Sequence, residues 1–138
     1  MPKEFTLPVR VYYEDTDAGG VVYYANYFKF MERARTEWLR KLGFDQRQLT
    51  AERGLIFVVA EAQAQYRRPA RFNDLLSIGV IVEEISGARM RFRQDIRRDD
   101  GELLCAGRIG AACLDVESFR PRPIPSDMLV ELNNAYAY

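Results

Sequence analysis

The sequence predicts an α+β protein in which one antiparallel sheet curls around one long central helix. Three patterns support this class: an N-terminal strand over Phe5–Tyr13, a long amphipathic helix over about Ala25–Leu42, and a run of strands from Leu55 to Asp115. Consecutive strands joined by short turns are typical of antiparallel sheets, and a lone amphipathic helix needs a sheet to cover its apolar side. The 138 residues contain no internal repeat or low-complexity tract, so we expect one domain over residues 1–138.

The first strand and the helix are predicted from the spacing of their apolar residues. Val9, Val11 and Tyr13 share one parity, and Pro8 suits the start or the edge of a sheet. In the helix, apolar residues recur at three- and four-residue steps and form one stripe. The stripe consists of Tyr27, Phe30, Met31, Ala34, Trp38 and Leu42. Gly43 is suited to end the helix.

Residues 45–53 are expected to form a short helix or an irregular connection, and the strands follow. They are predicted over Leu55–Tyr66, Leu75–Ile85, Ala88–Arg98 and about Glu102–Asp115. Ser86–Gly87 and Asp99–Gly101 have the composition of hairpin turns. This order supports a meandering antiparallel sheet.

Two further patterns concern the first of these strands and the C-terminal region. Ala60, Ala62 and Ala64 lie on one face, and this row of small residues suggests that another backbone, such as a helix, lies close to it. Residues 120–125 carry proline at every second position, which excludes a helix there. Ser126 can cap a short last helix over residues 127–134.

The overall composition excludes several classes of function. Lys and Arg number 20 and so do Asp and Glu, which argues against nucleic acid as the main partner. No stretch approaches the roughly 20 apolar residues of a membrane span. The N-terminal residues lack the apolar run of a secretory signal, so we expect a cytoplasmic protein. The chain has no histidine, which excludes Ser-His-Asp and Cys-His nucleophile systems.

The two cysteines, Cys105 and Cys113, are expected to be buried and unpaired. Both fall on one predicted strand, where a separation of eight residues corresponds to about 26 Å. A disulfide requires Cα atoms within about 7 Å of each other. Two thiols without histidine also cannot form an ordinary structural zinc site, so a reactive thiol is the remaining alternative.

The most informative stretch is Val11–Tyr27, which reads V-Y-Y-E-D-T-D-A-G-G-V-V-Y-Y-A-N-Y. It places Glu14, Asp15 and Asp17 directly ahead of the long helix. A carboxylate next to a helix N-terminus combines a base or nucleophile with N–H donors, which suits attack on an activated carbonyl. Alternatively, the aspartates could satisfy backbone donors in an Asp/Gly turn.

The motif D-x-D-x-G-G-V-V-Y-Y-x-N-Y resembles that of the hotdog-fold acyl-CoA thioesterases, in particular the 4-hydroxybenzoyl-CoA thioesterase family. Together with E-R-A-R-T-E-W-L in the helix, it resembles the branch associated with the bacterial Tol–Pal gene cluster. The resemblance extends from about Pro8 to Leu132. It implies a hotdog fold and hydrolysis of acyl-CoA to free acid and coenzyme A, without a metal or organic cofactor.

The resemblance also implies roles for individual residues. Asp17 corresponds to the catalytic carboxylate, acting as a general base on water or as a nucleophile that forms an anhydride. Tyr24 corresponds to the residue whose backbone N–H polarises the thioester carbonyl. The Tol–Pal-associated branch usually has histidine at this position, whereas the 4-hydroxybenzoyl-CoA enzymes have tyrosine, as here. This difference bears on the preferred acyl group.

Substrate-binding positions are predicted around these two residues. Gly19, Gly20, Val22 and Asn26 are expected to shape the binding loop, although the glycines could form an ordinary loop and Asn26 could serve only to begin the helix.

Arginines are expected to hold the coenzyme A phosphates. Arg89 and Arg91 are the first candidates, with a solvated outer face as the alternative. Arg67, Arg68 and Arg71 are further candidates for the phosphates.

Glu32 lies off the apolar stripe of the helix, near Arg35 and Thr36. An ion pair is expected there, with catalysis as the alternative, because other hotdog branches place a catalytic glutamate on this helix.

The resemblance implies a homodimer or homotetramer, since hotdog proteins pair two sheets edge to edge and place the active site at the interface. Hotdog dehydratases depend on histidine, which this chain lacks. The alternative function is a non-catalytic module that binds acyl thioesters or acyl carrier protein. Such a binder would not need the Asp17 carboxylate.

Overall fold

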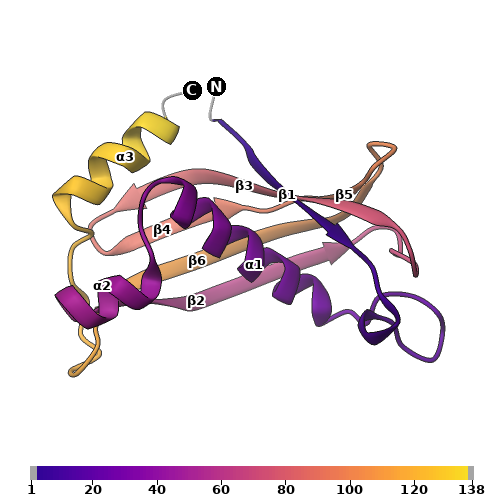
Figure 1. The fold of residues 1–138 in the computed structure, drawn as a ribbon, viewed down its shortest axis with the longest axis horizontal. Helices are drawn as coiled ribbons and strands as arrows, with labels where there is room; N and C mark the ends of the chain where they lie inside the picture. Colours follow the sequence, from indigo (N-terminus) through magenta and orange to yellow (C-terminus); the bar gives the residue numbers. More distant parts are fainter. Residues whose placement is uncertain (1–2, 137–138) are drawn as a thin grey trace.

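The computed structural model describes residues 3–136, which form one six-stranded antiparallel sheet with the long helix α1 across one face (Figure 1). The strands are β1 (Phe5–Arg10), β2 (Leu55–Tyr66), β3 (Leu75–Ser86), β4 (Arg89–Arg93), β5 (Ile96–Arg98) and β6 (Leu103–Asp115). The helices are α1 (Asn26–Lys41), α2 (Gln46–Arg53) and α3 (Ser126–Tyr136), with a 3₁₀ turn η1 (Tyr13–Asp15). The predicted α+β class is confirmed. No helix within residues 3–136 is long and apolar enough to cross a membrane.

The strand order is β1-β3-β4-β6-β2, and β5 continues the line of β4 between β3 and β6. Strands β1 and β2 are therefore the two edges of the sheet. Pro8 lies in the edge strand β1, as its missing N–H requires.

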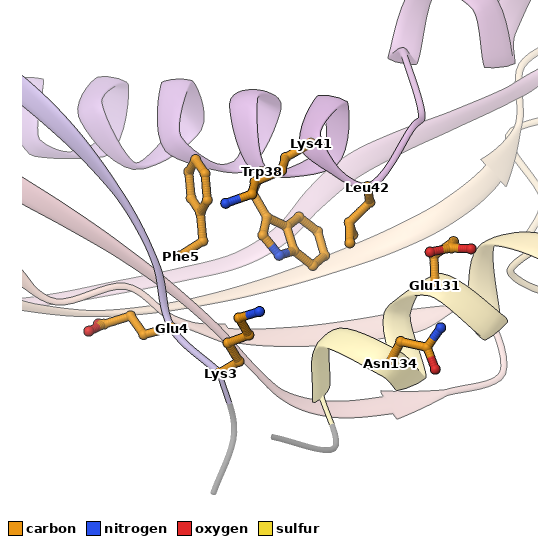
Figure 2. A pocket seen from close by; sticks show the side chains of 8 residues that line it. All are labelled: Lys3, Glu4, Phe5, Trp38, Lys41, Leu42, Glu131 and Asn134. Atoms are coloured by element: carbon orange, nitrogen blue, oxygen red, sulfur yellow. The ribbon is translucent and has the colours of Figure 1, made fainter.

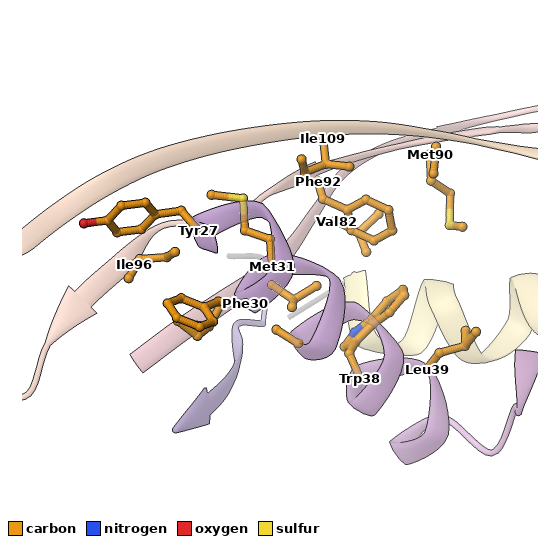
Figure 3. Packing of buried hydrophobic residues seen from close by; sticks show 14 of the residues in the cluster. Tyr27, Phe30, Met31, Trp38, Leu39, Val82, Met90, Phe92, Ile96 and Ile109 are labelled. Carbon is orange, nitrogen blue, oxygen red and sulfur yellow. The ribbon is translucent and has the colours of Figure 1, made fainter. Parts of the chain in front are cut away.

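Helix α1 packs its apolar stripe against the sheet, and the predicted helix is confirmed with a start at Asn26 and an end at Lys41. Its buried residues are Tyr27, Phe30, Met31, Ala34, Trp38 and Leu39. The Trp38 ring meets the Phe92 ring of β4 edge-on, with centroids 5.3 Å apart (Figure 3). Gly43 follows the helix with a φ of +97°, a conformation that glycine adopts without strain and that ends the helix.

The predicted strand Ala88–Arg98 is interrupted at Gln94 and Asp95, which separate β4 from β5. Gln94 is fully buried, and its Nε2 donates to the Met31 carbonyl at 2.9 Å while its Oε1 accepts from Arg35 Nη1 at 2.9 Å. A buried amide is costly unless it is hydrogen-bonded, so these bonds fix α1 against the sheet at one position along its length.

The expectation that a helix covers the alanine row of β2 is wrong. Ala60 and Ala62 are exposed, and only Ala64 is partly buried. The reason is topological: β2 is an edge strand, whereas α1 packs against β1 and β3 toward the other edge.

The first strand is shorter than predicted, because it ends at Arg10 and the chain turns at η1. The open alternative for residues 45–53 is decided in favour of a helix, α2, which Asp45 caps by accepting from Gln48 N at 3.1 Å. The last helix spans Ser126–Tyr136 and extends beyond the predicted residues 127–134 at both ends.

Cys105 and Cys113 both lie on β6, buried and unpaired, as predicted. Burial raises the pKa of the Cys105 thiol to about 12, which keeps it in its unreactive protonated form.

We predict that Gly107→Ala destabilises the protein, because the end of the Met31 side chain of α1 and the Gln94 backbone lie against β6 at this residue. A Cβ there would lie 2.5 Å from Met31 Cε and 2.7 Å from the Gln94 carbonyl oxygen. The methionine end can move, but the Gln94 carbonyl is part of the backbone, and the Gln94 N–H donates to the Gly107 carbonyl at 2.9 Å, which holds the two backbones together. Overpacking of this kind costs about 1–3 kcal/mol in the free energy of unfolding, measured by urea denaturation.

Gly110→Ala is the matched control on the same strand. Its Cβ would meet the nearest atom, Glu61 Cβ, at an ordinary 3.4 Å, so we expect a change within about 0.5 kcal/mol. Equal stability of the two variants would contradict the close approach of α1 and β6.

Candidate active site

The segment between η1 and α1 is a tight hairpin loop that displays Asp17 at the surface. Thr16 and Val22 pair as an isolated bridge, and Asp17 N donates to the Val21 carbonyl at 2.9 Å. Gly20 has a φ of +79°, so the turn depends on a residue without a Cβ. The prediction that both glycines adopt positive φ is therefore confirmed for Gly20, whereas Gly19 does not have a positive φ.

The Asp17 side chain is exposed, and its Oδ1 accepts from the Gly19 backbone N–H at 2.8 Å. The alternative prediction, that the aspartate satisfies a backbone donor in an Asp/Gly turn, is therefore confirmed for Oδ1 of Asp17. The other oxygen, Oδ2, has no hydrogen-bond or ion-pair partner in residues 3–136. The turn thus fixes the carboxylate and leaves one oxygen available.

Asp15 has the opposite environment, although it lies only two residues away. It is buried, and its Oδ2 accepts from Tyr12 N at 2.8 Å. Its carbonyl accepts from Tyr23 N at 2.9 Å and from Asn26 Nδ2 at 2.8 Å. Asp15 therefore shapes the turn, and Asn26 serves to tie the loop to the first residue of α1.

The N-terminal end of α1 has no capping side chain. Ala25 occupies the cap position without a side-chain hydrogen bond, and the first turn contains no acidic residue. Within residues 3–136, the Tyr24 N–H donates to no acceptor. An uncapped helix start leaves N–H groups and a positive dipole end that stabilise negative charge on a ligand.

A surface hollow of about 270 Å³ lies directly at this end of the helix. Its lining comes from the hairpin loop, the start of α1 and the segment after β2: Val21, Val22, Tyr24, Tyr27, Tyr66, Arg67, Arg68 and Pro69. Three tyrosines thus form its walls and two arginines its rim. Val22 is almost fully buried and lines the base of the hollow.

Arg67 and Arg68 were predicted as further candidates for the phosphates, whereas Tyr66 was not predicted as a site residue. They are far from the motif in sequence. Tyr66 pairs with Cys105 at the end of β2, and Arg67 and Arg68 N–H both donate to the Leu104 carbonyl, at 2.9 and 3.1 Å. The run Y-R-R-P after a strand was the only signal in the sequence.

The structure does not bring Arg89 and Arg91 to this hollow within one chain. Met90 and Phe92 point into the core against α1, so the two arginines face the other side of β4. There they line a separate hollow of about 510 Å³ together with Glu61 and Glu84. Their role in binding phosphate stays a prediction.

Glu32 is exposed on α1 and acts on Arg35 through its charge. Burial lowers the pKa of Arg35, and the Glu32 carboxylate offsets part of this effect. The expected ion pair is not found within residues 3–136, because the Arg35 Nη1 donates to Gln94 Oε1 and Glu32 acts on it only through its charge.

Another hollow, of about 250 Å³, lies at the opposite end of α1 (Figure 2). Its lining residues are Lys3, Glu4, Phe5, Trp38, Lys41, Leu42, Glu131 and Asn134. The C-terminal end of a helix carries the negative end of its dipole, which disfavours a developing oxyanion. The N-terminal hollow is therefore the better site for acyl transfer. In residues 3–136, no group of three or more Cys, Asp or Glu side chains could hold a metal ion.

Comparison with known proteins identifies the family of the chain. The family model of the thioesterase-like superfamily matches residues 11–132. The acyl-CoA thioesterase YbgC of Haemophilus influenzae is 44% identical over 124 residues, covering 90% of this chain and 90% of that protein. The acyl-CoA thioester hydrolase YbgC of Escherichia coli O157:H7 is 44% identical over 127 residues, covering 92% and 94%.

The fold is also found in solved structures. The crystal structure of a 1,4-dihydroxy-2-naphthoyl-CoA thioesterase from Synechocystis has a TM-score of 0.87 at 21% identity, covering 94% of this chain and 95% of that one. The predicted hotdog architecture is confirmed by this likeness. By the family match and the extent of its identity to the YbgC proteins, the chain belongs to the thioesterase-like superfamily.

Proposed function

We propose that the chain hydrolyses acyl-CoA to a free acid and coenzyme A at the N-terminal end of α1, with Asp17 as base or nucleophile and the Tyr24 N–H as oxyanion donor. One observation carries the proposal: a carboxylate with an available oxygen and an unpaired N–H at a helix N-terminus belong to one hydrogen-bonded loop. The acyl-CoA thioesterase names of the YbgC relatives support the reaction class.

Two chemical routes fit this arrangement. In the first, Asp17 takes a proton from water, the hydroxide adds to the thioester carbon, and collapse of the tetrahedral oxyanion breaks the C–S bond to release coenzyme A thiolate. In the second, an Asp17 oxygen attacks the carbon itself and the C–S bond breaks, leaving an anhydride that water hydrolyses. Both routes place negative charge on the carbonyl oxygen, where one backbone donor is worth about 2.7–4 kcal/mol.

The remaining loop residues prepare this geometry. Gly19 fixes the Asp17 carboxylate through its N–H, Gly20 allows the turn, and Asn26 ties the loop to α1. Val22 anchors the hairpin by donating its N–H to the Ala70 carbonyl at 2.8 Å. The arginine rim at Arg67 and Arg68 faces the solvent side of the hollow, where the coenzyme A phosphates would extend.

A homodimer or homotetramer is part of the proposal. Strand β2 is an edge of the sheet, and its residue Val59 is 50% exposed. A twelve-residue edge strand with exposed apolar side chains is a ready template for pairing with another chain. A partner could also bring Arg89 and Arg91 toward the substrate, which one chain alone does not achieve.

Asp17→Asn is expected to lower the rate of acyl-CoA hydrolysis by about 10²- to 10⁴-fold, because it removes the charge of the base or nucleophile. The asparagine keeps the Oδ1 acceptor for Gly19 N–H, so the turn is preserved. Thiol release from a panel of acyl-CoAs, aliphatic and aromatic, provides the measurement.

Asp100→Asn is the matched control. Asp100 is exposed and accepts from Glu102 N at 2.9 Å, the same spacing of two residues as Asp17 and Gly19. It should leave the rate within about twofold. Equal rates for both variants would remove Asp17 from the mechanism, and a wild-type chain that cleaves neither acyl-CoA nor acyl carrier protein thioesters would favour a binding module.

Replacing both rim arginines, Arg67→Gln and Arg68→Gln, is expected to raise the KM for acyl-CoA by about fivefold or more through loss of charge-assisted hydrogen bonds to phosphate. The KM for the corresponding acyl-pantetheine, which has no phosphate, should not change. Steady-state kinetics with both substrates make the comparison.

Arg47→Gln on α2, also exposed, controls for the loss of one positive charge away from the hollow. The pair Arg89→Gln and Arg91→Gln, measured in parallel, matches the loss of two. A rise in KM for acyl-CoA with that pair alone would transfer the phosphate role to the outer face of the sheet.

The oligomeric state is predicted to be two or four chains, measured by light scattering on the purified protein. A protein that stays monomeric at the concentrations used for the activity assay, while active, would contradict the need for a partner.

A further inference from the structure

Tyr66 links the end of β2 to the start of α1. Its hydroxyl donates to the Tyr24 carbonyl oxygen at 3.0 Å, across 42 residues of sequence. The residue is 47% exposed and lines part of the hollow. The residue therefore contacts both the proposed oxyanion donor residue and the space where a substrate would lie.

The contact is part of a wider attachment between the segment after β2 and the loop. Ala70 N donates to the Tyr27 hydroxyl at 3.1 Å, and the Ala70 carbonyl accepts from Val22 N at 2.8 Å. The Tyr66 ring centroid lies 5.3 Å from that of Tyr27 and 6.3 Å from that of Tyr24, at nearly a right angle to the latter. The segment after β2 thus holds the chain before Tyr24, at Val22, and after it, at Tyr27.

Around the Tyr24 N–H, the neighbouring backbone groups are engaged. Tyr23 N donates to the Asp15 carbonyl at 2.9 Å, and Asn26 N donates to the Tyr23 carbonyl at 2.8 Å. The Tyr24 carbonyl is held by Tyr66. The Tyr24 N–H shares its peptide plane with the Tyr23 carbonyl, which the Asn26 N–H holds. The Tyr66 hydroxyl holds the next peptide plane, on the other side of the Tyr24 Cα, so both planes that meet at Tyr24 are restrained.

We infer that Tyr66 is a positioning residue. Its hydroxyl holds the Tyr24 carbonyl and so limits rotation of the backbone about the Tyr24 Cα, which keeps the Tyr24 N–H in place for the thioester oxygen, while its ring forms a wall of the acyl site. This inference rests on the proposed function. A displacement of about 1 Å at such a donor can cost about 10²-fold in rate, so a hydroxyl that prevents it has a measurable effect.

The hydroxyl acts as a donor and not as a titrating acid. Burial raises the pKa of Tyr66, and the negative forms of Cys105, Tyr27 and Tyr24 would raise it further. The group therefore stays protonated through neutral pH. Its removal should change the rate without changing the pH at which the rate rises.

Tyr66→Phe is expected to lower kcat about tenfold, with KM for acyl-CoA within about twofold and an unchanged pH profile, because the ring remains and the hydroxyl is lost. Tyr13→Phe is the matched control, since the Tyr13 hydroxyl has no hydrogen bond in residues 3–136 and its ring is stacked on Phe72, 3.9 Å away. It should retain the wild-type rate. Tyr66→Leu removes the ring as well and should also raise KM.

A spectroscopic measurement separates positioning from a general loss of structure. A dethia acyl-CoA ketone keeps the carbonyl but cannot be hydrolysed, and its ¹³C-edited infrared stretch reports the polarisation of that carbonyl when bound. In Tyr66→Phe the shift to lower frequency should be smaller than in the wild type. A lower melting temperature with unchanged kcat and unchanged shift would make Tyr66 merely structural and overturn the inference.

Different results would contradict the proposed function and the inference about Tyr66. A wild-type protein that turns over no thioester and binds no ketone would end the proposed function, whatever Tyr66 does. A wild-type protein that turns over acyl-CoA, with Tyr66→Phe equal to it in kcat and carbonyl shift, would end only the inference about Tyr66.

Discussion

The rest of the molecule depends on the packing of α1 against the sheet, because this contact determines where the N-terminal end of the helix lies. The stripe from Tyr27 to Leu39 is covered by the sheet, and the buried Gln94 amide fixes the position through the Met31 carbonyl and Arg35. With the helix fixed lengthwise, its uncapped N-terminal end lies beside one small hollow that Tyr24 and Tyr27 help to line. The absence of a capping side chain leaves that end available to a ligand.

Asp15 and Asp17 show how two neighbouring carboxylates acquire different tasks from their environments. Asp15 is buried and holds the turn through Tyr12, Tyr23 and Asn26. Asp17 is exposed and uses one oxygen on the turn, which leaves the other oriented but unoccupied. The rigidity supplied by the first aspartate keeps the second in place without consuming its charge, which is the condition for a preorganised site.

The hollow joins three segments that the sequence keeps apart: the hairpin loop, the first turn of α1 and the residues after β2. Strand β2 is also an edge of the sheet and exposes Val59 and two alanines. The same strand therefore supplies the wall of the site at its end and the surface suited to a partner along its length. A change in the pairing of β2 would therefore shift Tyr66, and through its hydrogen bond to the Tyr24 carbonyl it would shift the start of α1.

The sequence alone determined the class of fold, the long helix, most strand positions and the loop that carries Asp17 and Tyr24. These features depend on local spacing, since a stripe at helical steps or an Asp-x-Asp-x-Gly-Gly turn is encoded by adjacent residues. Only the tertiary structure decided the break at Gln94, the exposure of the β2 alanines, and the joining of Tyr66, Arg67 and Arg68 to the site. These outcomes depend on which strand lies at an edge and on which segments meet across the fold, and contacts between residues far apart in the chain leave no period or spacing in the sequence.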